Sequence, residues 1–192
     1  MPHLRVYTSR GGRIFPFAWR FAGALILASF IATACAPRHI VDGFLVDEAL
    51  GFRIALLRDG WRRLEVEGAT LAFQAEPGGQ VAALFVSCEE RQPITLHVLA
   101  KRLFFGIRAK RVVTQNVISL SGTEAVHTVL TGRLEEADVM VSSYVARNGE
   151  CAYDLVYVAS PETFQDRLPE FERFVQGWTL TENTPGRGTE RQ

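Results

Sequence analysis

The 192-residue chain has no excess of charge of either sign, since 21 basic residues balance 21 acidic ones. Nucleic-acid-binding proteins usually carry an excess of basic residues, which this sequence does not have, so no nucleic-acid partner is expected. Apolar residues make up 47% and charged residues 22% of the sequence, which is ordinary globular usage. Disorder, a collagen-like chain and a membrane protein with several spans are therefore excluded, and one domain is expected.

The sequence also lacks the motifs that carry most metal and enzyme chemistry. It contains no Cys-x-x-Cys, His-Glu-x-x-His, Gly-x-Ser-x-Gly or Gly-x-Gly-x-x-Gly pattern and no phosphate-binding loop. His39, His97 and His127 fall in different predicted elements, so we expect solvated or packed histidines. These absences predict a protein without metal, cofactor or enzymatic activity.

The first 34 residues lack acidic residues altogether but contain four arginines. They lead into an apolar run, residues 21–32, which is shorter than the ~20 residues that a membrane-spanning helix needs. A basic start, a short apolar core and small residues at its end are typical of a secretory signal, here residues 1–34. No Arg-Arg pair precedes the apolar run, which favours general secretion over the twin-arginine route.

Cys35 directly follows this signal. The segment Ile31-Ala32-Thr33-Ala34-Cys35 resembles the lipobox of bacterial lipoproteins, in which the cysteine is lipidated and begins the mature chain. The resemblance predicts a cell-envelope protein that is lipid-anchored to the inner or outer membrane and faces the periplasm or exterior. Ala32 stands where the lipobox usually has Leu, and Ala-x-Ala also suits ordinary signal peptidase. A secreted form without lipid and an uncleaved anchor are the alternatives.

Lipidation of Cys35 leaves two cysteines, Cys88 and Cys151, both in predicted strands. In an oxidising compartment the two thiols can pair, closing a loop of 63 residues that is worth about 4 kcal/mol in the chain-entropy model. The alternative is two buried thiols.

The mature chain divides into residues 35–50, a lipidated cysteine and tether, residues 51–180, a single domain, and residues 181–192, a polar tail. Within the domain, apolar residues at steps of three and four predict helices near residues 95–106 and 164–178. Pro169 either kinks or divides the second helix. Strands are predicted at 52–57, 61–66, 69–75, 80–88, 112–120, 124–134, 139–147 and 150–158.

The Asn148-Gly149 dipeptide is a strong hairpin signal and predicts the register of its two strands. A two-residue loop there places Ser143 opposite Asp154, as a buried polar pair. Both faces of this hairpin are otherwise apolar, so we expect a helix on each side. The predicted fold is α+β, a single-domain α/β/α sandwich with a mostly antiparallel sheet of about seven or eight strands.

The element order of four short strands, helix, four strands and helix resembles the PsbP/Mog1-like sandwich family and uncharacterised bacterial lipoproteins of that type. The residues that carry the resemblance lie between positions 50 and 180: the strand Phe52-Arg53-Ile54-Ala55-Leu56, then Asp59-Gly60-Trp61, Leu99-x-x-x-Leu103-Phe104-x-Gly106 and Cys151-x-Tyr153-Asp154-x-Val156-Tyr157-Val158-Ala159. Members of this family are accessory or adaptor proteins; PsbP supports photosystem II, and Mog1 binds a small GTPase. The family has no shared catalytic residues, so the resemblance implies a fold and a binding role.

These observations predict a lipid-anchored accessory module that tethers or assists a membrane-associated envelope protein. Five basic residues near the end of the first helix form a candidate partner surface: Lys101, Arg102, Arg108, Lys110 and Arg111. A small-ligand or lipid-transport role is the first alternative, and it requires an apolar pocket between sheet and helix. A hydrolase-like enzyme around Asp154 is the second, and it requires convergent polar residues.

Overall fold

The computed structural model describes residues 38–88 and 94–181. The predicted signal 1–34, Cys35 and residues 182–192 of the predicted tail lie outside these residues. The first half contains the strands β1 (His39–Val41), β2 (Phe44–Asp47), β3 (Phe52–Ala55), β4 (Trp61–Arg63), β5 (Leu71–Ala75) and β6 (Val81–Cys88). The second half contains α1 (Leu96–Leu103), β7 (Arg108–Leu120), β8 (Thr123–Leu134), β9 (Ala137–Asn148), β10 (Cys151–Ala159), α2 (Phe164–Gln176) and β11 (Thr179–Leu180).

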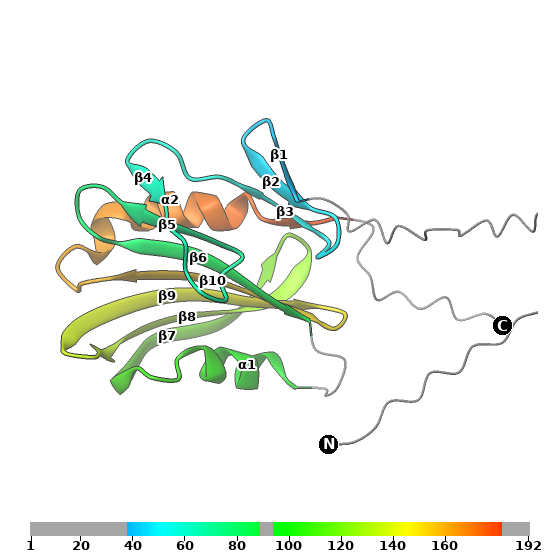
Figure 1. The fold of residues 1–192 in the computed structure, drawn as a ribbon. Coiled ribbons are helices and arrows are strands. Elements are labelled where there is room, and N and C mark those ends of the chain that lie inside the picture. The colour runs from blue at the N-terminus through cyan, green and yellow to red at the C-terminus, as the bar shows by residue number, and fades with distance from the viewer. Residues whose placement is uncertain (1–37, 89–93, 182–192) are drawn as a thin grey trace, which may run out of the picture. The chain divides into compact units, whose positions relative to one another are not determined.

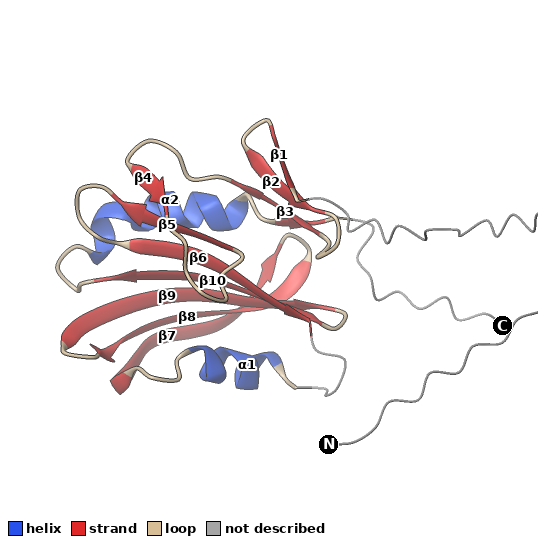
Figure 2. Cartoon of the chain, viewed as in Figure 1, coloured by secondary structure: helices blue, strands red, loops and turns tan. Residues whose placement is uncertain are grey.

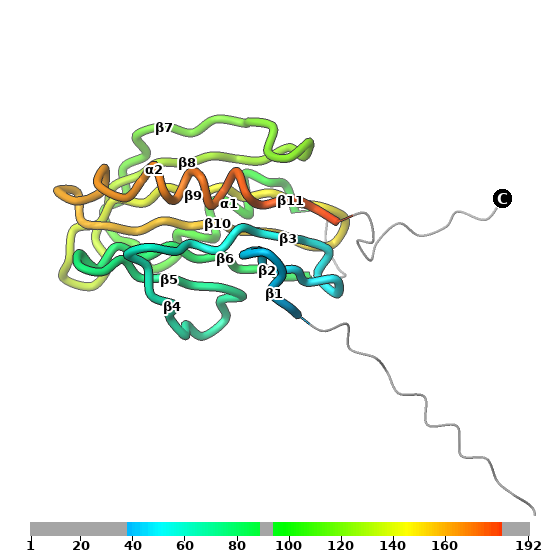
Figure 3. Tube along the Cα trace, turned by 90° about the horizontal axis from the view of Figure 1, so that it is seen from above, coloured from blue at the N-terminus to red at the C-terminus, as the bar shows by residue number. Residues whose placement is uncertain are grey.

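Seven strands form one antiparallel sheet in the order β4-β5-β6-β10-β9-β8-β7. A smaller sheet has the order β1-β2-β3-β11. Helix α2 and the smaller sheet cover one face of the larger sheet, and α1 lies on the other face (Figures 1 and 2). From above, α2 and β3 lie side by side over the larger sheet (Figure 3). The predicted α+β sandwich is confirmed.

The main core lies between the larger sheet and α2. Aromatic rings fill it: Tyr157 stacks on Phe171 with ring centroids 5.4 Å apart, and Tyr153 packs on Trp178 at 5.1 Å. All four side chains are completely buried. Two smaller apolar clusters lie under α1, on the opposite face of β8, β9 and β10. Both faces of the β9–β10 hairpin are therefore covered over part of their length, as its two apolar faces predict.

The predicted register of this hairpin is wrong by two residues. Asn148 pairs with Cys151, so the loop is Gly149-Glu150, and Gly149 supplies the positive φ (59°) that a tight hairpin loop needs. Because a shift of two residues returns every side chain to the same face, the predicted apolar faces hold although the pairs change. Ser143 lies opposite Val156, and the predicted Ser143–Asp154 pair does not form.

Two further expectations differ from the structure. The predicted tether 35–50 contains β1 and β2, because Leu45 and Asp47 on alternate positions of β2 are both buried. Asp47 is satisfied there by the Arg38 guanidinium at 2.8 Å and the Leu50 amide at 2.9 Å. The domain therefore begins at β1. Helix α2 is one continuous element that contains Pro169, so the alternative of two separate helices is wrong.

Candidate functional site

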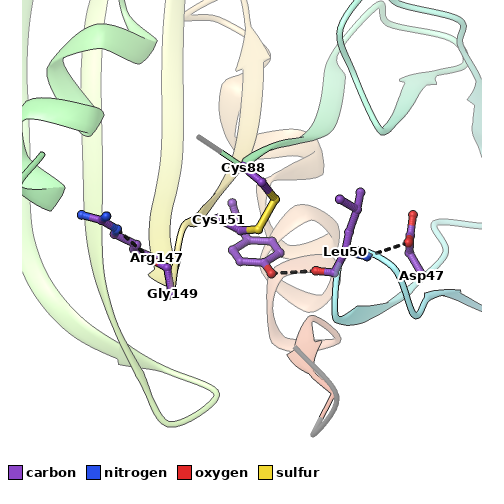
Figure 4. The surroundings of a disulfide bond; sticks show 7 residues. Asp47, Leu50, Cys88, Arg147, Gly149 and Cys151 are labelled. Atoms are coloured by element: carbon purple, nitrogen blue, oxygen red, sulfur yellow. Dashed lines mark hydrogen bonds between the residues drawn. A yellow bond between two sulfur atoms is a disulfide. The ribbon is translucent and has the colours of Figure 1, made fainter. Parts of the chain in front are cut away.

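A disulfide between Cys88 and Cys151 joins the adjacent strands β6 and β10 (Figure 4). The two cysteines are direct partners in the antiparallel register. Near them the Tyr153 hydroxyl donates to the Leu50 carbonyl at 2.7 Å, which links β10 to the turn between β2 and β3. This region ties the two sheets together, and its polar groups bond to one another, so its role is structural.

An apolar concavity lies on the face of the sheet that carries α1; we call it the apolar groove. It has a volume of about 240 Å³. Every residue that lines it is apolar: Val66, Val81, Ala83, Phe85, Leu103, Phe104, Phe105, Ile107, Leu134, Val139, Val141, Val156 and Val158. Such a lining favours an aliphatic ligand, since it offers side chains with neither charge nor hydrogen-bonding groups.

The apolar groove exists because α1 is too short to cover the sheet. The helix has eight residues, contacts mainly β8 and β9, and ends at Leu103. The neighbouring strands β6 and β10 keep apolar residues on this face, and the chain after the helix only partly closes it. Phe105 at the rim is 94% exposed, and Val66 and Leu134 beside the groove are exposed as well. Clustered exposed apolar residues of this kind mark interaction sites more often than scattered ones do.

A second cavity, of about 180 Å³, lies beside the groove; we call it the polar cavity. Asp154, Ser87, Arg102, Arg147 and Glu150 supply its polar lining. The Asp154 Oδ1 atom is buried and accepts no hydrogen bond from any described residue. Burial raises the pKa of Asp154 to about 6, because the charged form loses hydration without gaining a donor. The Asp154 side chain as a whole is only partly buried and lines the cavity, so its carboxyl group borders the space that a ligand would occupy.

The five predicted surface cations are all exposed and lie on both sides of the groove's rim. Lys101 and Arg102 are in the last turn of α1, and Arg108, Lys110 and Arg111 begin β7. Lys110 donates to the Phe104 carbonyl at 3.1 Å, and Arg108 lies 3.4 Å from the Glu136 carboxylate. The cluster is thus divided between structural contacts and free cations.

One histidine has a polar partner that sequence reasoning missed. His127 Nε2 and Ser142 Oγ are 3.1 Å apart, and the His127 ring stacks on Tyr144 at 4.1 Å. Burial lowers the pKa of His127, and the charge of Glu172 opposes this. Ser142 is only 1% exposed, so its hydroxyl is closed to a substrate and the pair packs the core. The described ranges, 38–88 and 94–181, hold no group of three or more residues suited to a metal ion.

A third cavity, of about 330 Å³, lies between α2 and the loop that precedes β4. Two of its polar side chains, Trp61 and Glu170, bond to each other. The Trp61 indole donates to Glu170 at 2.6 Å, and Arg167 donates to the same carboxylate at 3.0 Å. These bonds hold α2 against β4, and Arg58, Asp59 and Arg173 also line the cavity.

Sequence reasoning identified Asp154 and the basic cluster, and it named an apolar pocket between sheet and helix only as the requirement of the ligand-binding alternative, without its residues. The sequence contained one signal of an exposed apolar surface. Phe104 and Phe105 directly follow the last apolar position of the helix, and two adjacent side chains cannot both point into the same core. The groove itself depends on how much of the sheet one short helix covers, which no local pattern contains.

None of the helices within 38–88 and 94–181 is long and apolar enough to span a membrane. No protein-family model matches the chain, and no curated protein matches its sequence.

Solved structures match its fold. CyanoP, the PsbP protein of Synechocystis sp. PCC 6803, is 11% identical over 68% of this chain and 86% of its own, with a TM-score of 0.50. LpqN of Mycobacterium tuberculosis, described as involved in cell envelope biogenesis, is 14% identical over 68% of this chain and 83% of its own, with a TM-score of 0.54. At such identities the likeness concerns the fold alone, and the chain has the PsbP-like fold.

Proposed function

We propose that this protein is a lipid-anchored accessory module of the bacterial cell envelope that acts without catalysis and binds an aliphatic chain. The observation that carries the proposal is the apolar groove, with its wholly apolar lining and the exposed ring of Phe105 at its rim. An aliphatic chain transferred from water into this groove gains about 0.8 kcal/mol for each methylene that is buried.

The anchor supports the same assignment. Cys35 precedes His39, the first residue of β1, by four positions, so a lipid on Cys35 holds the domain within about 14 Å of the membrane surface. Such confinement raises the effective concentration of the groove near membrane lipids and membrane-bound partner proteins. The fold-level likeness to LpqN, a protein described as involved in cell envelope biogenesis, supports an envelope location. A module that presents an apolar groove close to a membrane suits the capture or transfer of lipid chains.

The groove is tested with cis-parinaric acid, a naturally fluorescent fatty acid, and the folded domain. Ala83→Phe fills the groove from its floor, and we expect it to abolish saturable binding. Phe105→Ser removes the exposed ring, which has few packing contacts to lose, and we expect binding to weaken by about tenfold.

Matched controls use exposed valines of β7 that lie outside the groove. Val117→Phe places the same aromatic side chain as Ala83→Phe on the surface of β7, and Val113→Ser removes an exposed apolar side chain that is smaller than Phe105. Both controls should bind cis-parinaric acid like the unmodified domain. Equal affinity in Phe105→Ser and Val113→Ser, together with unchanged binding in a folded Ala83→Phe variant, would overturn the proposal.

A further inference from the structure

The polar cavity and the apolar groove are neighbours on one face of the sheet, and we call the two together the depression. Leu103 lines both cavities. Asp154 of the polar cavity and Phe85 of the groove are direct cross-strand partners on β10 and β6. The two cavities together reach the roughly 300–1,000 Å³ that small-molecule sites typically have. The depression therefore has a charged end and an aliphatic end.

We propose that this depression binds a single-chain amphiphile whose head group carries both an ammonium and a phosphate, with the head in the polar cavity and the chain in the groove. The inference rests on the proposed function, because it takes the groove as the site of the aliphatic chain. It adds the head-group chemistry, which the groove alone does not specify.

Asp154 selects the ammonium. Its Oδ1 atom is buried and accepts no hydrogen bond from the described part of the chain. Its cross-strand neighbours Phe85 and Val145 are apolar and cannot donate through their side chains. A buried carboxylate without a donor is unfavourable, and a ligand ammonium supplies both the missing donor and the opposite charge.

Arg102 selects the phosphate. It is exposed in the last turn of α1, borders the polar cavity, and makes no ion pair within residues 38–88 and 94–181. Its planar guanidinium can donate two parallel hydrogen bonds to phosphate oxygens.

The second arginine of the polar cavity, Arg147, has a different role. Its Nε and Nη1 atoms already donate to the carbonyls of Gly149 and Ile94, at 3.0 and 2.8 Å. Glu150 lies on the same wall and balances its charge. With Asp154 and Arg102 counted as well, the formal charge of the cavity is zero, which favours a zwitterionic head over a purely anionic or cationic one.

The test measures displacement of cis-parinaric acid from the folded domain by two probes that share an acyl chain. Lysophosphatidylethanolamine carries the ammonium and the phosphate, whereas lysophosphatidylglycerol carries the phosphate without the ammonium. We expect the unmodified domain to bind the ethanolamine probe about tenfold more tightly than the glycerol probe. Asp154→Asn should remove that preference, and Asp166→Asn, on α2 at the opposite face of the sheet, should retain it.

Arg102→Gln should weaken both phospholipid probes, and Lys101→Gln, one residue earlier on the same helix but outside the polar cavity, should weaken neither. An unchanged head-group preference in Asp154→Asn would overturn the inference even if Ala83→Phe abolishes binding, in which case the aliphatic groove stands alone. If a folded Ala83→Phe variant binds every probe like the unmodified domain, the proposed function itself is contradicted, and the head-group inference that rests on it falls as well. Equal loss in Arg102→Gln and Lys101→Gln would show a general effect of surface charge and would also overturn the phosphate assignment.

Discussion

Asp154 is the residue whose surroundings depart most from what its chemistry requires. It lies on β10 between β6 and β9, where its partners in the two registers are Phe85 and Val145. Arg102, Arg147 and Glu150 are the charged residues that line its cavity, and none of them bonds to its buried oxygen. Burial therefore dominates and raises the pKa of this carboxyl to about 6.

This pKa predicts how stability changes with pH. Between about pH 4 and pH 6 the folded protein keeps a proton on Asp154 that the unfolded chain has already released. The free energy of unfolding therefore falls as pH rises through this window, by about 3 kcal/mol for a pKa raised by about two. The Asp154→Asn variant has no carboxyl group to titrate at this position. The difference in free energy of unfolding between the variant and the unmodified protein should therefore shift in favour of the variant from pH 4 to pH 7.

Urea unfolding of both proteins across this pH range provides the measurement, with Asp166→Asn as the control for a changed surface charge. If the free energies of unfolding of Asp154→Asn and of the unmodified domain change with pH in parallel from pH 4 to pH 7, Asp154 is not a buried carboxyl without a donor.

At the scale of elements, β6 and β10 organise the molecule. They pair over eight positions, carry the disulfide at one end and form the floor of the groove along their length. They are far apart in the sequence, and α1, β7, β8 and β9 lie between them. The pairing of these two strands therefore closes a long loop of the chain, and the disulfide reinforces that closure.

Removal of the disulfide should reduce stability without changing the fold. In the variant that carries both Cys88→Ser and Cys151→Ser, the unfolded chain regains the freedom of a 63-residue loop, which lowers the free energy of unfolding by about 2–4 kcal/mol. The native pairing of β6 with β10 remains, so binding of cis-parinaric acid should be unchanged.

Urea unfolding with and without reductant checks this. The unmodified domain should lose stability on reduction, and the double variant should not respond to the reductant. Equal free energies of unfolding for the unmodified domain and the double variant in the absence of reductant would contradict the prediction.

The β9–β10 hairpin shows which structural features a local residue pattern predicts and which it does not. Alternation of apolar residues identified the strands and both faces of the β9–β10 hairpin, because each face must meet a helix. The pattern did not fix the register, since pairing at Asn148-Gly149 and at Gly149-Glu150 presents the same faces. In this turn Gly149 alone has positive φ and is the first loop residue, whereas a type I′ loop at Asn148-Gly149 needs positive φ at both of its residues. The Ser143–Asp154 pair failed for this reason.

For the whole molecule, the balanced charge of the sequence divides at Cys35. The segment before it has four arginines and no acidic residue, and the chain from residue 35 onward has 17 basic and 21 acidic residues. This division fits the proposal that a basic leader is removed on export and a mildly acidic domain remains. On this interpretation, location is set by the leader and Cys35, and ligand binding is set by the domain.

The variant Cys35→Ala tests whether membrane location and ligand binding are independent. We expect this variant to leave the membrane fraction and to bind cis-parinaric acid with unchanged affinity, because Cys35 precedes the first strand of the domain. Mass spectrometry of the unmodified mature protein should find a diacylglyceryl group on an N-terminal Cys35. A mature chain that begins after Cys35, or a membrane fraction unaffected by Cys35→Ala, would contradict lipid anchoring.

The sequence by itself determined both helices, the longer strands, their apolar faces and the layered fold, because periodicity and turn chemistry act between residues close in the chain, but it did not reveal β1, β2 and β11. The proposed leader and the proposed lipid on Cys35 also rest on the sequence alone. Only the tertiary structure decided which distant strands are neighbours, and so placed Cys88 beside Cys151 and Asp154 beside Phe85. The groove was decided there too, since it results from an eight-residue helix lying on a seven-stranded sheet that it is too short to cover.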